Sequence, residues 1–211
     1  MIKFLPTLLF FLSLGFVILY VALKFKANKE FSFANSFPFE SNKTSLAIRT
    51  SFILIFAFSL CSIFFYLNIY FNIFKNNYIL IATIATFAIC ILFLFLNIVN
   101  LVNLKVHFLL FSAFAAIVTT SSVVLGFHAI NAYKIDSTIW MYIVVAVIHF
   151  IKALFELILV SPLFKFSFLM DVNVDDGTLK RPKFIRLAFY EWLYLFFFII
   201  NNFLLLIVQM V

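Results

Sequence analysis

Three ionisable side chains, His149, Lys152 and Glu156, recur at helical spacing inside one long apolar stretch. At 100° per residue they fall within an arc of about 60° on one face of a helix. Lys152 lies thirteen residues before Lys165 and sixteen after Asp136, which corresponds to about 20 and 24 Å of helix. Its ammonium group therefore cannot reach water at either end. Groups of this kind bind or transfer protons, bind an ionic solute, or join helices through a buried ion pair.

The charge of Lys152 needs a partner close by. A charged side chain at mid-membrane costs about 2.5 to 3.5 kcal/mol on insertion scales. Glu156 is the i+4 neighbour of Lys152, so the two can compensate each other either as an ion pair or by sharing a proton. We refer to His149, Lys152 and Glu156 as the polar triad.

The elements that must position the triad follow from composition. Apolar residues make up 66% of the 211 residues and charged residues only 11%, whereas a soluble domain carries roughly a quarter charged residues. Continuous apolar runs without in/out alternation favour helices over a membrane barrel. Each of six runs can cross a hydrocarbon layer of about 30 Å as a helix. We expect an all-α polytopic membrane protein, a single transmembrane domain built as a six-helix bundle with short loops, with spans at about 4–23, 50–73, 78–102, 106–131, 138–164 and 187–211.

Polar residues of the neighbouring spans are expected to face the triad. Folding the fourth and fifth spans about residue 134 brings Glu156 level with Ser112 and His149 level with Thr119. The sixth span contributes a polar face within an arc of about 100°, formed by Glu191, Tyr194, Asn201, Asn202 and Gln209. The expected intramembrane polar site comprises His149, Lys152, Glu156, Thr119, Thr120, Ser112, Asn201 and Asn202.

Basic residues are distributed unequally between the two ends of these spans. Eleven lie on the side of the long loops 24–49 and 165–186, and three lie on the opposite side. The positive-inside rule therefore predicts that both long loops are cytosolic and both termini non-cytosolic. A basic cluster at the start of the sixth span is expected to attract anionic lipid headgroups, and it consists of Lys180, Arg181, Lys183 and Arg186.

Two motifs suggest bound metals, and neither is complete. The segment 171–177 alternates oxygen ligands as a calcium loop does, but Pro182 stands where the closing Glu belongs. We expect a turn at 176–177 between short extended arms instead. His107 and His128 are 21 residues apart on one helix, about 31 Å, so they cannot hold one haem iron, and we assign both to the interface. We expect no metal and no cofactor.

The first long loop alternates Phe31, Phe33, Phe37 and Phe39 with polar residues. This pattern is typical of a segment that lies on the membrane interface or docks on a partner. Packing is the expected role of the two cysteines, Cys61 and Cys90, which fall near mid-bilayer.

The sequence contains neither H-E-x-x-H nor G-x-S-x-G, nor a phosphate-binding glycine loop. We therefore expect a non-enzymatic multi-pass membrane protein, an accessory or scaffold subunit that packs against partner helices and lipid. A small transporter or proton-coupled carrier using the polar site is the alternative, followed by an intramembrane lipid enzyme with His149 as base. Expected partners are membrane lipids and either another membrane protein or a second copy of this chain, and not nucleic acid.

The topology can be tested by single-cysteine labelling after Cys61 and Cys90 are replaced by alanine. Because the basic excess lies on the loop side, residues in 24–49 and 165–186 should react with impermeant reagents added to the cytosolic side. Labelling of a cysteine at Val211 from that side would contradict the assignment.

Overall fold

The structure is a computed structural model, and it describes residues 4–27, 32–38, 77–99, 104–161, 174–175, 178–179 and 184–210. The described part of the chain contains five helices and a pair of two-residue strands. The predicted second span, 50–73, lies outside the described residues. The helices are α1 (Phe4–Ala27), α3 (Asn77–Ile98), α4 (Leu104–Ile135), α5 (Met141–Val160) and α7 (Arg186–Met210).

Four of these helices are long and apolar enough to cross a membrane, which confirms the prediction of a helical membrane-type bundle at that level. The apolar part of α1 is shorter and covers Thr7–Leu23. The four segments are Asn77–Leu96, Lys105–Ile135, Met141–Val160 and Arg186–Val208.

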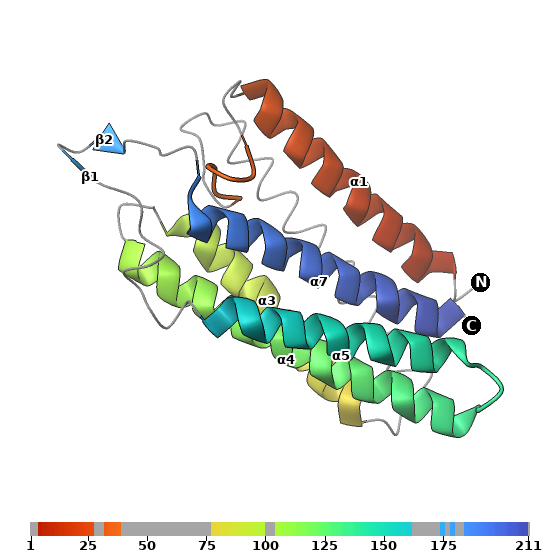
Figure 1. Ribbon diagram of the computed structural model, residues 1–211. Helices are drawn as coiled ribbons and strands as arrows, with labels where there is room; N and C mark the ends of the chain where they lie inside the picture. Colours follow the sequence, from red (N-terminus) through yellow and green to blue (C-terminus); the bar gives the residue numbers. More distant parts are fainter. Residues whose placement is uncertain are drawn as a thin grey trace.

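Helix α4 occupies the centre of the arrangement. It packs against α3 and α5 and contacts α7, which in turn contacts α5 and α1 (Figure 1). With 32 residues, α4 is about 48 Å long and exceeds the hydrocarbon thickness of about 30 Å. Polar residues of α4 form hydrogen bonds with α5 and with α7.

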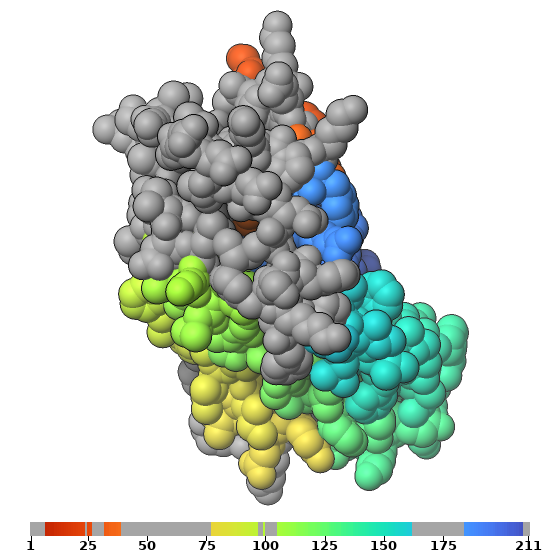
Figure 2. Space-filling model, turned by 60° about the vertical axis from the view of Figure 1, so that its left-hand side comes forward, coloured from red at the N-terminus to blue at the C-terminus, as the bar shows by residue number. Residues whose placement is uncertain are grey.

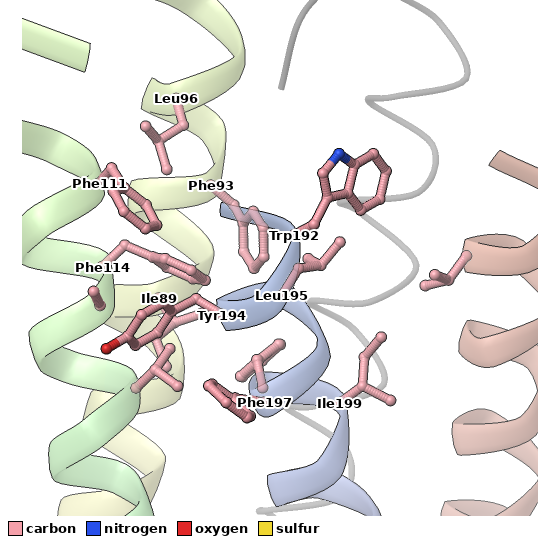
Figure 3. Packing of buried hydrophobic residues seen from close by; sticks show 14 of the residues in the cluster. Ile89, Phe93, Leu96, Phe111, Phe114, Trp192, Tyr194, Leu195, Phe197 and Ile199 are labelled. Atoms are coloured by element: carbon pink, nitrogen blue, oxygen red, sulfur yellow. The ribbon is translucent and has the colours of Figure 1, made fainter. Parts of the chain in front are cut away.

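Aromatic side chains fill the interior between α3, α4 and α7 (Figure 3). The rings of Phe93 and Phe114 lie 4.9 Å apart, and those of Phe111 and Tyr194 lie 5.7 Å apart, both edge to face. Edge-to-face contacts add to the burial of large apolar surfaces. This aromatic core holds α7 close to α4, which brings the polar face of α7 within reach of α4.

The α4–α5 connection differs from the predicted one. The fourth span was predicted to end at about residue 131, but helix α4 continues through Lys134 and ends at Ile135. The turn follows at Asp136, whose Oδ1 accepts hydrogen bonds from the hydroxyl of Thr138 and from its backbone N–H at 3.1 Å. Because these bonds stabilise the carboxylate, they hold the pKa of Asp136 below its usual range.

A two-stranded antiparallel pair forms between α5 and α7. Strand β1 (Val174–Asp175) pairs with β2 (Thr178–Leu179), and Asp175 stands opposite Thr178. The expected extended arms on either side of residues 176–177 are therefore confirmed.

Residues 32–38 return to the beginning of α7, and we call them the docked segment (Figure 1). The carbonyl of Ala34 accepts a hydrogen bond from the Ile185 N–H at 2.6 Å, and the carbonyl of Ser36 accepts one from the indole Nε1 of Trp192 at 2.7 Å. On the other side, the hydroxyl of Tyr20 donates to the carbonyl of Pro38. This part of the Phe-rich loop thus docks on its own chain.

Gly126 allows α5 to approach α4 closely. A Cβ atom at this position would lie 3.0 Å from the Phe150 ring. We expect Gly126→Leu to lower the free energy of unfolding by about 1 to 3 kcal/mol through overpacking. Gly15→Leu is the matched control, because nothing lies within 4 Å of that position. Thermal unfolding in detergent measures both, and equal effects would contradict the close approach.

Candidate functional site

The polar triad lies in the interior, and Ser122 of α4 joins two of its members. The Lys152 ammonium donates hydrogen bonds to Ser122 Oγ at 2.6 Å and to Glu156 Oε1 at 2.7 Å. Ser122 Oγ lies 2.8 Å from Glu156 Oε2 and 3.2 Å from Asn201 Nδ2. A hydroxyl group has one proton and two lone pairs, so Ser122 donates to Glu156 and accepts from Lys152 and Asn201.

Both charged groups of this cluster are shielded from the surroundings. The exposed fraction is 7% for Lys152 and zero for Glu156. The ring of Phe197 covers the ammonium group, with Nζ 5.3 Å from the ring centroid. A cation over an aromatic face is stabilised by the ring quadrupole, so the apolar neighbour also contributes to holding the charge.

Helix α7 attaches to the same cluster at two further points. The hydroxyl of Tyr194 donates to the backbone carbonyl of Glu156 at 2.7 Å. The imidazole of His149 lies next to the Asn201 side chain. His149 Nδ1 and Asn202 Oδ1 are buried and have no hydrogen-bond partner among the described residues.

The structure separates the remaining predicted site residues. Thr119 is buried next to the Tyr194 hydroxyl. Thr120 is exposed and its hydroxyl donates to Ala116 within α4, while the hydroxyl of Ser112 donates to the carbonyl of Phe108. Both hydroxyls thus bond within α4, and in the described part of the chain neither forms a hydrogen bond with the triad.

The predicted pairing of depths between α4 and α5 was wrong. Glu156 lies beside Ser122 and not level with Ser112. The midpoint of 122 and 156 is residue 139, five positions after the predicted fold point at residue 134. The fold point moves along the chain because α4 is about one turn longer than the predicted span and continues through Lys134.

A second buried polar pair was not predicted. His107 Nε2 of α4 lies 2.7 Å from Glu191 Oε1 of α7, and the exposed fractions are 1% and zero. His128 is also buried between the helices. The sequence does contain a signal for this pair. His107 and Glu191 both lie within two turns of the beginnings of their helices, so they are expected at a similar depth in the membrane.

The predicted headgroup cluster is described only in part. Arg186 is the first residue of α7 and is half-buried, whereas Lys180, Arg181 and Lys183 lie outside the described residues. Within the described ranges, no group of three or more His, Cys, Asp or Glu could hold a metal ion.

The chain matches no known family model, no curated protein and no solved structure.

Ser122 should contribute more to stability than its neighbour Ser121. Ser122→Ala removes hydrogen bonds from Lys152, Glu156 and Asn201, so we expect a loss of about 1 to 3 kcal/mol. Ser121→Ala is the matched control, because Ser121 is equally buried but its hydroxyl has no partner among the described residues. Unfolding in detergent compares the two, and equal losses would contradict the central position of Ser122.

Proposed function

We propose that this chain is a non-enzymatic multi-pass membrane protein that acts as an accessory or scaffold subunit, and that its buried charges serve to hold helices together. The observation that carries the proposal is that the charge of the Lys152 ammonium group is compensated within the chain. Its ammonium has a carboxylate, a hydroxyl and an aromatic ring as neighbours within the chain. A charge compensated in this way needs no bound solute as a counter-ion, and removing either partner of the pair destabilises the packed helices.

The placement of these groups supports a packing role. The cluster joins Ser122 of α4, Lys152 and Glu156 of α5 and Asn201 of α7. Interhelical hydrogen bonds of this kind are worth about 0.6 to 2 kcal/mol each inside a membrane. Three helices are thereby tied at one depth, which specifies how they pack.

The outer surface supports contact with lipid or with partner helices. In Figure 2, α3, α4 and α5 lie side by side on one face. Large apolar side chains project from α5 away from the triad, and their exposed fractions lie between 49% and 64%: Val147, Ile151, Leu154, Phe155, Leu157 and Ile158. We propose that this face meets acyl chains or another membrane protein.

We further propose six membrane crossings, with loops 24–49 and 165–186 on the cytosolic side and anionic headgroups near Arg186. The basic asymmetry supports this arrangement, and so do the four apolar helices.

A proton-coupled carrier remains the second candidate, because one observation favours it. Two buried polar atoms have no hydrogen-bond partner in the part of the chain that the structure describes, namely Nδ1 of His149 in the triad and Oδ1 of Asn202 on α7. Unpartnered polar atoms in an apolar interior are unfavourable unless a proton, a water molecule or a solute visits them.

A double-mutant cycle on Lys152 and Glu156 distinguishes the two roles. Each single change, Lys152→Met or Glu156→Leu, leaves one charge without its partner and should cost about 3 to 5 kcal/mol. The combined variant leaves no uncompensated charge, so its unfolding temperature in detergent should return toward that of the unchanged protein.

Assays of membrane assembly and of transport on the double variant distinguish the scaffold from the carrier. A scaffold predicts that the combined variant keeps its normal membrane assembly, because only packing is needed. A carrier predicts a stable double variant that has lost proton-linked transport in vesicles. A double variant no more stable than either single variant would refute the pairing.

A further inference from the structure

The His107–Glu191 pair lies outside the triad and has its own surroundings. It joins α4 to α7 through a single contact of 2.7 Å between Nε2 and Oε1. The other polar atom of each group, His107 Nδ1 and Glu191 Oε2, is buried and has no hydrogen-bond partner among the described residues. The pair thus has hydrogen-bonding capacity that the described residues around it do not use.

The number of protons on the pair determines its net charge. With one proton, on Nε2, the pair is a neutral imidazole and a carboxylate, with a net charge of −1 and two unused acceptor atoms. With a second proton, the net charge is zero whether that proton sits on Nδ1 or on the carboxylate. An apolar interior disfavours uncompensated charge, so the enclosed form of the pair is the one with two protons.

The docked segment packs against this pair and against the residue that follows Glu191. Phe37 is buried, and its ring meets the imidazole of His107 edge to face with centroids 5.9 Å apart. Phe33 meets the indole of Trp192 in the same way at 5.0 Å. Trp192 directly follows Glu191 in α7 and donates to the Ser36 carbonyl. The docked segment is therefore bonded to Trp192, the residue next to the Glu191 carboxylate.

We propose that His107 and Glu191 form an enclosed proton-binding site, and that residues 32–38 are a cover whose closure is linked to occupancy by the second proton. Loss of that proton leaves a net charge that only water stabilises, so deprotonation favours an opened cover. The ligand is a proton delivered by water. The inference does not depend on the role of the triad, which is a separate cluster.

Other titratable groups near the pair are few in the part of the chain that the structure describes. The docked segment itself contains none. Lys105 is exposed, Arg186 is half-buried, and the Tyr194 hydroxyl is committed to the Glu156 carbonyl. The described titratable groups at this end of the packed helices are Tyr20 and Lys26 of α1, Cys90 of α3, Lys105 of α4, Glu156 of α5, and Arg186, Tyr190 and Tyr194 of α7.

Trp192 provides a direct probe of the cover. The chain has two tryptophans, and Trp140 is exposed at the beginning of α5, so Trp140→Phe leaves Trp192 as the single reporter. The full chain in detergent is taken from about pH 6 to about pH 9, a range in which most carboxyl groups do not titrate when exposed. We expect a reversible red shift of Trp192 emission and stronger iodide quenching as the pH rises.

Three variants in the same background assign the transition. Glu191→Gln keeps the shape of the side chain but removes its proton equilibrium, so the spectral transition should disappear. Tyr190→Phe is the matched control, a neighbouring titratable residue on α7, and should keep the transition. Tyr20→Phe removes one fastening of the cover and should move the midpoint to lower pH.

The proposal fails if Trp192 emission and quenching are independent of pH in the unchanged protein. It also fails if Tyr190→Phe abolishes the transition, or if Tyr20→Phe leaves the midpoint unchanged. If Glu191→Gln does not fold, the shift caused by Tyr20→Phe still decides whether the cover and the proton are linked.

Discussion

The cost of a buried charge in an apolar interior is the constraint on which this structure depends. The described helices place Lys152, Glu156 and Glu191 where they are at most 7% exposed. Each charge must therefore find its partner within the chain. Lys152 and Glu156 are partners on the same helix, one turn apart on α5. Glu191 finds its partner on another helix, at His107 of α4.

Helix α4 meets this requirement because it alternates small polar and apolar residues on its inner faces. Ser122 is small enough to lie between α5 and α7, and its hydroxyl both donates and accepts. Gly126, one turn further, lets the Phe150 ring of α5 come close to the α4 backbone. Close approach and hydrogen bonding support each other, since the Lys152 ammonium reaches Ser122 only across a short interhelical distance.

The two polar clusters are linked through α7, although their surroundings differ. Glu191 and Tyr194 lie one turn apart, and Tyr194 reaches the backbone carbonyl of Glu156. Among the described residues, the triad contacts α4 and α7, whereas the His107–Glu191 pair is also contacted by a non-helical segment that approaches α7 through backbone carbonyls. A cover held by a few hydrogen bonds and ring contacts opens at lower cost than a packed helix interface does.

The sequence by itself determined the helical class, the burial of the triad and the i, i+4 pairing of Lys152 with Glu156, because hydrophobic runs and helical periodicity are local properties. It also determined the polar face of α7, on which Glu191, Tyr194 and Asn201 are all buried. Only the tertiary structure decided that Ser122 lies beside Glu156, because the register of two antiparallel helices depends on where the turn falls, and α4 continues to Ile135. The His107–Glu191 contact was likewise decided by the packing of α4 and α7, since residues 84 positions apart meet only when two helices align.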